Sequence, residues 1–472
     1  MKTDPHKIHL IGICGTGMGS LAGLFAAAGH EVRGSDENVY PPMSTMLEKQ
    51  GIRLMPGYSP SNLDWHPDLV VIGNIVTRTN PEGEEVLRRG LPYRSFPQAV
   101  GEFFLEGRHP VVVAGTHGKT TTTALMGWVL MEAGRDPSWL VGGVLCGQER
   151  SFRLGKGSHF VIEGDEYESA YFDKGSKFLH YRPRTALLTS VEFDHAEMFQ
   201  DLDSVKRAFA AFLALVPEDG ALVVCADDPE VRAIAAKCRG QKIEYAVREK
   251  AAWVGRTRKA TQDGILFDVF RGNERYASFS SPLTGAHNLA NILAVVAACS
   301  QLGLEPEEIG KGLASFPGVK RRQEIRGIRR GMTVVDDFAH HPTAVRGTIA
   351  ALAERFAGQR LWAVFEPRTN TSRRAIFQAD YAEAFDQADE VIVSAVDHPE
   401  RAPQGDRFSA QKLVEDLQGR GLSARYIPEV AAIVKTLAQE SRDGDVVLIM
   451  SNGSFGGIHQ RLLDALGEGG SG

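Results

Sequence analysis

The sequence predicts an α/β protein built from several domains, each with a mostly parallel sheet. Short apolar, β-branched runs alternate with longer amphipathic stretches along the chain, which is the pattern of strands joined by crossover helices. Some runs, such as Val111–Val113, are apolar at every position, as strands covered on both faces are. The length of 472 residues corresponds to two to four domains, at about 100–200 residues each.

The expected strands and helices follow from this alternation. The strand-like runs are His9–Ile13, Leu69–Ile72, Val111–Ala114, Phe160–Glu163, Thr185–Thr189, Ala221–Cys225, Met332–Val335, Leu361–Phe365, Glu390–Val393 and Val446–Met450. The helical patterns are Met18–Ala28, Lys119–Ala133, Ser204–Leu215, Asn288–Leu302, Pro342–Phe356, Ala410–Leu417 and Val430–Gln439. A further stretch, residues 255–280, alternates as a meander of short strands does.

Two breaks in the alternation are candidate domain boundaries. One, Glu106–Pro110, precedes a new strand and a glycine loop, and the other, Phe316–Lys320, follows a long helical stretch. The sequence therefore predicts domains over residues 1–107, 108–318 and 319–472.

The composition excludes several classes of protein. The formal net charge is −6 and the pI about 6.2, whereas a generic nucleic-acid binder usually carries a basic face. No apolar run approaches the ~18 residues of a membrane helix, and the first residues lack the apolar core of a signal peptide. The five cysteines are widely spaced without a CxxC pair, so they suggest neither a disulfide framework nor a zinc site. We therefore expect a cytoplasmic protein without membrane or nucleic-acid partners.

A phosphate-binding loop follows the strand that ends at Ala114. In the segment GTHGKTT a glycine turn precedes a helix, so that backbone N–H groups and the helix N-terminus face a phosphate chain. Lys119 would reach the terminal phosphates, and the Thr120 hydroxyl would bind Mg²⁺. The match is incomplete, because Val113 stands where the first glycine is usual, and a glycine-rich turn with a surface lysine is the alternative. The expected ATP-binding residues are Gly115, Thr116, His117, Gly118, Lys119, Thr120 and Thr121.

A second glycine loop follows the first strand. It resembles a dinucleotide-binding loop, and an acidic residue follows near the end of the next strand. Alone, the loop fits a plain tight turn or an NAD site equally well. Two phosphate-type loops in two domains instead suggest a nucleotide-bearing substrate on the first domain and ATP on the second. The residues concerned are Gly15, Thr16, Gly17, Met18, Gly19, Ser35 and Asp36.

Acidic and histidine side chains stand at the ends of two later strands. Glu163 and Glu166 end one strand, and His195 follows another. Because the carboxyl ends of parallel strands share one edge of a sheet, these groups are expected beside the phosphate loop. They could hold a second Mg²⁺, or they could be solvated loop carboxylates and a hydrogen-bonded histidine.

Two further motifs suit ligands. The first, His287-Asn288-x-x-Asn291, opens a helix, and its amides suit an adenine edge, although helix capping is the plainer interpretation. The second, Asp336-Asp337-Phe-Ala-His340-His341-Pro342, suits either a metal site or a ligand loop from a third domain. Arginines that could meet phosphates or carboxylates are Arg321, Arg322, Arg368, Arg373 and Arg374.

Taken together, these motifs resemble the Mur ligases, the ATP-dependent amide ligases of peptidoglycan assembly. Five motifs occur in the family's order: residues 115–121, 163–166, 192–195, 287–291 and 336–342. The resemblance covers essentially the whole chain. It implies a Rossmann-like UDP-sugar domain, a central ATPase domain with a mostly parallel sheet and a small antiparallel sheet, and a Rossmann-like C-terminal domain for an amino acid or peptide.

The resemblance also implies the substrates. The first glycine loop, Gly34–Asp36 and Asn80–Glu82 look like those of the branch that acts on UDP-N-acetylmuramate. Where the branch adding free L-alanine has two arginines for its carboxylate, this chain has Thr369 and Ser372. The longer stretch 167–181 looks like the branch that adds the recycled tripeptide L-alanyl-γ-D-glutamyl-meso-diaminopimelate. The tripeptide is therefore the expected amine, with L-alanine as the alternative.

Roles for individual residues follow from the same resemblance. ATP would phosphorylate the lactyl carboxylate, and the peptide amine would then displace phosphate. Lys119, Glu163 and His195 are the expected catalytic residues, with Thr120, Glu163 and His195 as Mg²⁺ ligands and Glu166 in reserve. His287, Asn288, Asn291, Arg321 and Asp337 would complete the ATP site, and Arg368, Asn370, Ser451, Asn452 and His340 would bind the peptide. The position of the lysine that some relatives carbamylate near Mg²⁺ falls near Phe209, and Lys206 is close but out of register, so the resemblance does not carry this modification over.

Three other functions would use part of these features. A nucleotide-binding regulator would need both loops but would form no ADP, and an NAD-dependent dehydrogenase would leave residues 119–123 unexplained. A simple P-loop kinase would release a stable phosphorylated product instead of an amide. The sequence does not fix the oligomeric state.

Overall fold

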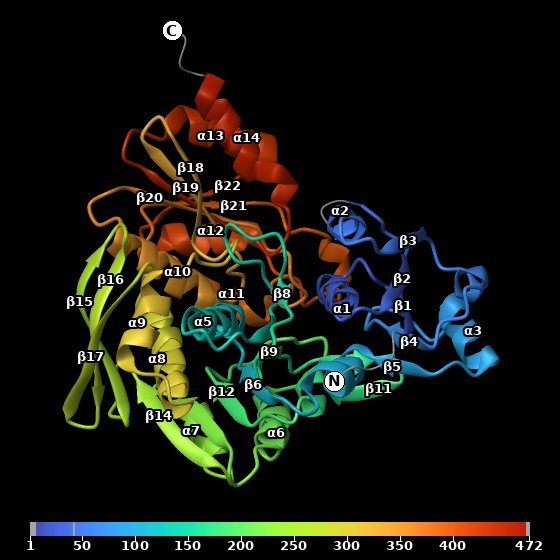
Figure 1. The fold of residues 1–472 in the computed structure, drawn as a ribbon. Helices are drawn as coiled ribbons and strands as arrows, with labels where there is room; N and C mark the ends of the chain where they lie inside the picture. The colour runs from blue at the N-terminus through green and yellow to red at the C-terminus, as the bar shows by residue number, and fades with distance from the viewer. Residues whose placement is uncertain (1–5, 41–42, 469–472) are drawn as a thin grey trace.

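The structure, a computed structural model, describes residues 6–40 and 43–468 and is organised around three large sheets (Figure 1). The first sheet has the strand order β3-β2-β1-β4-β5 and is parallel throughout. Its strands are β1 (Lys7–Ile11), β2 (Glu31–Asp36), β3 (Arg53–Pro56), β4 (Leu69–Ile72) and β5 (Tyr93–Ser95), and its helices are α1 (Thr16–Ala27), α2 (Met43–Glu48), α3 (Pro81–Arg89) and α4 (Phe96–Val100). The order reverses beside β1, which places the first glycine loop at the usual ligand edge of an open parallel sheet.

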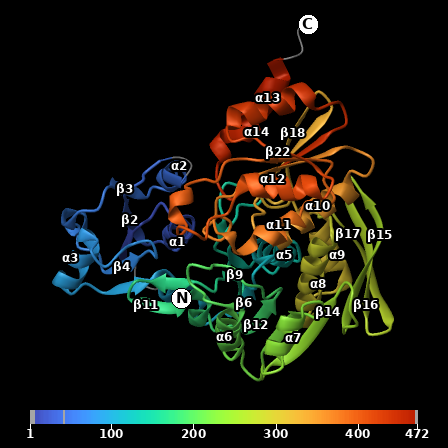
Figure 2. The ribbon, with the colours of Figure 1, turned by 180° about the vertical axis from the view of Figure 1, so that it is seen from behind.

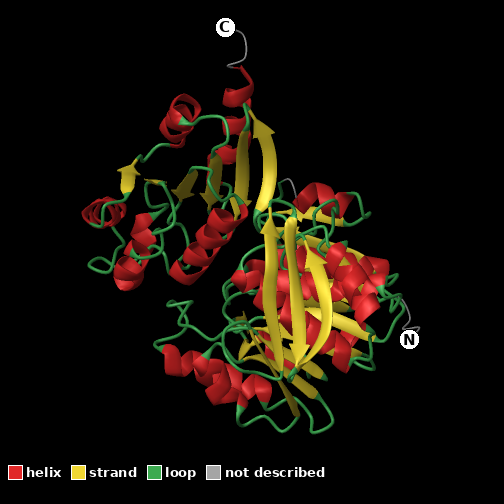
Figure 3. Ribbon diagram, turned by 90° about the vertical axis from the view of Figure 1, so that its left-hand side faces the viewer, coloured by secondary structure: helices red, strands yellow, loops and turns green. Residues whose placement is uncertain are grey.

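The central sheet has ten strands in the order β17-β16-β15-β14-β13-β12-β6-β9-β7-β8. They are β6 (His109–Ala114), β7 (Ser138–Leu140), β8 (Phe152–Arg153), β9 (His159–Gly164), β12 (Thr185–Leu188), β13 (Ala221–Cys225), β14 (Gln241–Ala246), β15 (Trp253–Thr261), β16 (Gly264–Arg271) and β17 (Glu274–Ser281). The expected meander is β15–β17, and it continues this sheet as an antiparallel end, visible as the long strands in front in Figure 3. The helices are α5 (Lys119–Glu132), α6 (Leu202–Leu213), α7 (Pro229–Ala235), α8 (Ala286–Gln301) and α9 (Pro306–Ala314).

The third sheet has the order β18-β19-β23-β20-β21-β22, with β18 antiparallel to β19 and the other pairs parallel. The strands are β18 (Glu324–Arg329), β19 (Met332–Asp337), β20 (Leu361–Phe365), β21 (Glu390–Val393), β22 (Ser423–Tyr426) and β23 (Val446–Met450). The helices are α10 (Pro342–Arg355), α11 (Gln378–Ala382), α12 (Ala410–Gly419), α13 (Val430–Glu440) and α14 (Ile458–Glu468). Apolar clusters lie on both faces of the sheet, as the uninterrupted hydrophobic strands require.

One apolar cluster joins the first unit to the central one. It contains residues of α1 together with Val112, Phe152 and Phe160 of the central sheet. A small antiparallel hairpin, β10 (Glu168–Ala170) and β11 (Asp173–Ser176), adds a second contact, since the rings of Phe172 and Tyr93 lie 4.9 Å apart. Figures 1 and 2 both show β11 beside the first unit.

The expected α/β class is confirmed, and most strand and helix limits differ from expectation by no more than two residues. At the first loop, β1 ends at Ile11 and α1 begins at Thr16, so residues 12–15 form the turn itself. The domain limits at residues 107 and 318 stay a prediction. None of the helices in the described residues is both long and apolar enough to span a membrane.

Candidate active site

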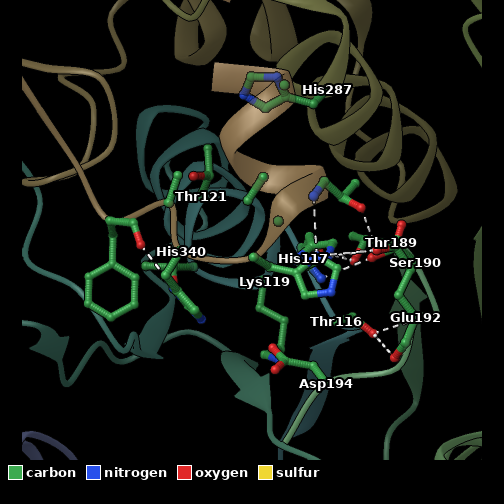
Figure 4. A pocket seen from close by; sticks show the side chains of 18 of the residues that line it. Thr116, His117, Lys119, Thr121, Thr189, Ser190, Glu192, Asp194, His287 and His340 are labelled. Atoms are coloured by element: carbon green, nitrogen blue, oxygen red, sulfur yellow. Dashed lines mark hydrogen bonds and ion pairs between the residues drawn. The ribbon is translucent and has the colours of Figure 1, made fainter. Parts of the chain in front are cut away.

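A cavity of about 1560 Å³ lies between the central and C-terminal units and holds most of the motif residues (Figure 4). The phosphate loop, the segment after β12, the start of α8 and the loop before α10 contribute to its lining. The loop after β20 lines the C-terminal side, and Asn74 reaches it from the first unit. All three units therefore border one space, as a reaction between several substrates requires.

The phosphate loop adopts a conformation that only glycine tolerates at two points. Gly115 has φ 136°, and a Cβ there would lie 2.2 Å from the Thr189 hydroxyl. Gly118 has φ 82°, and a Cβ there would lie 2.4 Å from Oδ1 of Asn291. Because Gly118 caps α5 without a side chain, the first amides of the helix stay free to bind an anion.

Lys119 is held at this loop by two acceptors. Its Nζ donates to the Gly115 carbonyl at 2.7 Å and to the Glu166 carboxylate at 3.0 and 3.2 Å. Burial opposes the positive charge, but the Glu166 and Asp165 carboxylates outweigh it and raise the pKa of Lys119. The lysine is thus a buried cation placed at the N-terminus of α5.

Of the predicted Mg²⁺ ligands, Thr120 and Glu163 lie together. The Thr120 hydroxyl donates to Glu163 Oε2 at 3.2 Å, and the amide of Gly142 donates to Oε1 at 2.6 Å. Burial and the nearby Asp165 raise the pKa of Glu163 to about 7. A divalent cation would relieve this accumulation of buried carboxylates.

His195, the third predicted ligand, lies beside Glu166 instead of Glu163. Its Nε2 is 3.6 Å from Glu166 Oε1, and its Nδ1 is 3.5 Å from Glu197. Burial lowers the pKa of His195, but the Glu197 hydrogen bond and the Asp194 charge reverse the effect and raise it. Glu166, the residue expected only as a reserve Mg²⁺ ligand, therefore lies between Lys119 and His195 and contacts both.

The three residues expected at adenine, His287, Asn288 and Asn291, line the cavity, and Figure 4 shows His287 across the cavity from Asp194. Asn288 donates to the Thr284 carbonyl at 2.9 Å, and Asn291 donates to Asn288 Oδ1 at 3.3 Å. Desolvation inside the cavity, with His117 nearby, lowers the pKa of His287 to about 4, although the side chain is open to the cavity. The asparagines hold the start of α8 and also face the nucleotide loop.

Neighbouring arginines at the start of the C-terminal unit have different partners. Arg321 donates to the carbonyls of Ser451 and Gly453, so it fixes the loop after β23. Arg322 instead lines the cavity and donates to the Thr120 hydroxyl at 3.3 Å. Asp337 accepts from the amides of Gln323 and Ala339 at 2.8 and 2.7 Å and also lines the cavity.

Of the expected peptide-binding residues, Arg368, Asn370, Asn452 and His340 line the C-terminal side of the cavity, whereas Ser451 is buried and does not line it. Arg368 lies over Gly453, where a Cβ would be 2.3 Å from its Nε, and its guanidinium is 3.9 Å from Glu366 and 3.8 Å from Asp397. Asn452 Oδ1 is buried without a hydrogen-bond partner, which leaves an acceptor for a ligand. The other three have protein partners: Asn370 with Arg373, Ser451 with Glu366, and His340 with the Phe338 carbonyl.

The first glycine loop lies in the first unit, apart from this cavity. Residues 15–19 form the end of the turn and the start of α1. The Asp36 carboxylate accepts from the Cys14 amide at 2.9 Å, and the Ser35 hydroxyl donates to Glu82 at 2.9 Å. Glu82 is fully buried against His9, a pair that sequence reasoning missed although the Asn80–Glu82 motif contains one member.

A cluster that joins three of the motifs also escaped the sequence analysis. His117, Glu192 and His341 meet at the seam between the central and C-terminal units. Glu192 and His341 each lie inside a recognised motif, but nothing in the sequence indicates that the motifs touch. Lys206, the lysine near Phe209 in the sequence, is paired with Glu230 at 2.6 Å and does not line the cavity.

Comparison with known proteins covers almost the whole chain. Family models match residues 7–108 (Mur ligase family, catalytic domain), 113–299 (Mur ligase middle domain) and 321–453 (Mur ligase, glutamate ligase domain). The Escherichia coli UDP-N-acetylmuramate–L-alanyl-γ-D-glutamyl-meso-2,6-diaminoheptandioate ligase is 42% identical over 98% of both chains.

Two solved structures resemble the whole molecule. A murein peptide ligase from Psychrobacter arcticus has a TM-score of 0.72 and 37% identity over 98% of this chain and 99% of its own. A UDP-N-acetylmuramate–alanine ligase from Thermotoga maritima has a TM-score of 0.80 but 25% identity, with the same coverage. The alanine ligase is thus more similar in backbone, whereas the murein peptide ligase is more similar in sequence. We give identity more weight for substrate choice, because the side chains at a site, not the overall fold, decide what binds.

Proposed function

The chain belongs to the Mur ligase family of ATP-dependent amide ligases, and from this premise we propose that it joins L-alanyl-γ-D-glutamyl-meso-diaminopimelate to UDP-N-acetylmuramate. The observation that carries the proposal is the 42% identity over 98% of both chains with the E. coli ligase named for these substrates. The reaction would return a recovered peptidoglycan fragment to synthesis.

Activation of the lactyl carboxylate is the first chemical requirement. A carboxylate does not react with an amine at neutral pH, because an oxide is a very poor leaving group. Transfer of the γ-phosphoryl group from ATP converts that oxide to phosphate, and the tripeptide amine then attacks the acyl carbon. Lys119 and the free amides of α5 stabilise charge on the phosphoryl group during transfer.

Mg²⁺ is the proposed metal. Glu163, a half-buried carboxylate with its pKa raised to about 7, and the Thr120 hydroxyl offer the oxygen donors that Mg²⁺ prefers. When bound there, the ion would neutralise charge on the β- and γ-phosphates. His195 and Glu166 are proposed at the acyl end, where they orient the carboxylate that receives the phosphoryl group.

The C-terminal side of the cavity is the proposed peptide site. Arg368 is partly exposed and bonded only at 3.8–3.9 Å, so its guanidinium can take a peptide carboxylate in bidentate geometry. Thr369 and Ser372 hydrogen-bond to each other at 2.9 Å, and neither supplies a cation for the carboxylate of free alanine. A cation at Arg368, with none at positions 369 and 372, supports an amine substrate longer than free alanine.

A side-by-side amine assay tests the proposal. Purified protein receives UDP-N-acetylmuramate, ATP and Mg²⁺ with either the tripeptide or L-alanine, and both ADP and the amide product are measured. We expect amide formation with the tripeptide to have a kcat/KM at least about 100-fold higher, a difference of about 2.7 kcal/mol in transition-state stabilisation. Faster product formation with alanine would establish the alternative ligase.

We also propose that the protein is cytoplasmic and that its three domains are divided at residues 107 and 318. Both nucleotide substrates are intracellular metabolites, and the five cysteines are all free thiols, as in a reducing compartment. Each predicted domain contains one of the three large sheets.

A further inference from the structure

A second candidate metal site lies at the seam between the central and C-terminal units. Among the described residues, His117, Glu192 and His341 are the group of histidine and acidic side chains whose ligand atoms all lie within 4.8 Å of one another. His117 belongs to the phosphate loop, Glu192 to the segment after β12, and His341 precedes α10. In Figure 4, His117 and Glu192 lie on the side of the cavity that also holds Ser190.

The spacing of the three side chains suits a tetrahedral ion. One oxygen of Glu192, Oε2, lies 3.1 Å from His117 Nε2 and 3.5 Å from His341 Nδ1. Ligands at about 2.0–2.1 Å from a tetrahedral Zn²⁺ are about 3.3 Å apart. The side chains therefore need only small rotations to surround an ion, with the fourth position open to water.

Outer partners already orient two of the three ligands. His341 Nε2 lies 3.3 Å from the Phe193 carbonyl, and Nδ1 accepts from the Thr343 amide at 3.3 Å. This pattern places the proton on Nε2 and engages the Nδ1 lone pair with the Thr343 amide, so an ion bound at Nδ1 would replace that long hydrogen bond. The Thr343 hydroxyl donates to Glu192 Oε2 at 2.7 Å. A carbonyl behind a metal-binding imidazole is the usual arrangement in protein zinc sites.

The donor set distinguishes this group from the proposed Mg²⁺ ligands. Two imidazole nitrogens and one carboxylate suit Zn²⁺, Co²⁺ or Ni²⁺, whereas Mg²⁺ prefers oxygen. We propose that His117, Glu192 and His341 form a transition-metal site of the Zn²⁺ class that ties the phosphate loop to α10.

Occupancy of this site has a mechanical consequence. His117 and Glu192 belong to the central unit and His341 to the C-terminal unit, so one ion would bond the two units directly beside the nucleotide cavity. Opening of the cavity would then require a metal–ligand bond to break. Zn²⁺ at this site therefore slows turnover by retaining product.

Metal titration of the full-length protein tests the site without any substrate. Co²⁺ is added in the presence of excess Mg²⁺, which occupies the oxygen-rich site, and the visible absorption of tetrahedral Co²⁺ is recorded. Competition with Zn²⁺ gives the zinc affinity. We expect one Co²⁺ per chain, displaced by one Zn²⁺.

Three variants separate ligation from folding. Glu192→Gln and His341→Asn remove a ligand, and asparagine retains the acceptor that caps α10. Thr343→Val removes an outer partner, which typically weakens binding about 10–100-fold, so loss of a ligand should cost more than about 100-fold. His398→Gln is the control, because His398 pairs with Glu400 on the surface of the same unit. Thermal unfolding verifies that each variant is folded.

The outcomes are distinct from those of the amine assay, because metal binding needs neither nucleotide nor peptide. Absence of stoichiometric tetrahedral Co²⁺, or equal Zn²⁺ affinity in wild type, Glu192→Gln and His341→Asn, overturns the site. Turnover measured with and without one equivalent of Zn²⁺ tests the consequence: kcat should fall in wild type and in His398→Gln. An unchanged wild-type kcat would refute the product-retention role.

Discussion

At the scale of single residues, buried carboxylates organise the phosphate loop before any nucleotide arrives. Glu166 holds the Lys119 ammonium at 3.0 Å and faces His195 at 3.6 Å. The lysine therefore avoids the cost of an unpaired buried charge, and its Nζ already lies at the loop. Incoming phosphates would compete with Glu166 for this cation, so nucleotide binding would release the carboxylate toward His195 and the acyl site.

A pair of histidines at the starts of β6 and β9 makes stability sensitive to acid. Burial, His159 and Arg184 lower the pKa of His109 to about 4, against an ordinary value near 6.5. The unfolded chain therefore binds a proton that the folded chain resists between these values. Stability is present in full above pH 6.5 and falls as the pH drops toward 4.

We expect His109→Gln to reduce that loss of stability, because glutamine does not take up a proton in this pH range. Glutamine can also keep a hydrogen bond with the Thr185 hydroxyl, which lies 2.9 Å from His109 Nε2. The measurement is the urea midpoint at pH 7 and at pH 5, with the surface variant His398→Gln as the control. An equal drop in midpoint for wild type and His109→Gln would contradict the assignment.

At the scale of elements, helices that are capped by a side chain contrast with helices that are capped by a glycine. Asn80, Asp201, Asp228 and Ser409 cap α3, α6, α7 and α12 with side-chain hydrogen bonds. In contrast, α1, α5 and α8 begin after Gly15, Gly118 and Gly285, which offer no side chain. A glycine cap leaves the first amides unpaired and lets a ligand approach the backbone. The three glycine-capped starts coincide with three motifs expected to contact a nucleotide.

Close packing of α1 on the central unit depends on a missing side chain. A Cβ on Gly23 would lie 2.2 Å from the buried ring of Phe152 in β8. We expect Gly23→Ala to lower the free energy of unfolding by about 1–3 kcal/mol, because overpacking forces the ring or the helix to shift. The check is equilibrium unfolding in urea.

Gly419→Ala is the matched control for this substitution. Gly419 also lies in a helix, α12, and a Cβ there meets no atom within 4 Å. Removal of backbone freedom should make that variant neutral or more stable by up to about 1 kcal/mol. Equal stability of Gly23→Ala and wild type would show that α1 can move away from Phe152.

At the scale of the whole molecule, the reaction site belongs to no single unit. The cavity takes residues from the phosphate loop, from the C-terminal loops and, through Asn74, from the first unit. Arg322 and Thr343 cross from the C-terminal unit to Thr120 and Glu192. Thr371 and Arg374 make further hydrogen bonds of this kind, to Asp194 and the Ala196 carbonyl. Such polar contacts are weak compared with the apolar cores, so closure of the units should depend on the ligands.

Small-angle scattering would measure this closure. We expect a smaller radius of gyration when a non-hydrolysable ATP analogue and UDP-N-acetylmuramate are present together than with either alone. The reason is that ATP would bind in the cavity between the central and C-terminal units, whereas UDP-N-acetylmuramate would bind in the first unit, which borders that cavity only through Asn74. An unchanged radius with both ligands would show that the units already have their closed arrangement.

The sequence by itself determined the features that depend on neighbouring residues. Continuous apolar runs identified β4, β13, β20, β21 and β23 with their exact limits, and the glycine pattern identified the turn before Lys119. Both signals are local, since strand burial and positive φ angles are set by a residue and those beside it. The order of five motifs also identified the family before any coordinates.

Only the tertiary structure decided which distant side chains meet. It brought Arg322 rather than Arg321 to Thr120, paired buried Glu82 with His9, and assembled His117, Glu192 and His341 from segments far apart in the sequence. It likewise placed Phe152 against Gly23. Such contacts depend on how sheets and helices pack and on which way each side chain points, and neither is encoded in the spacing of residues along the chain.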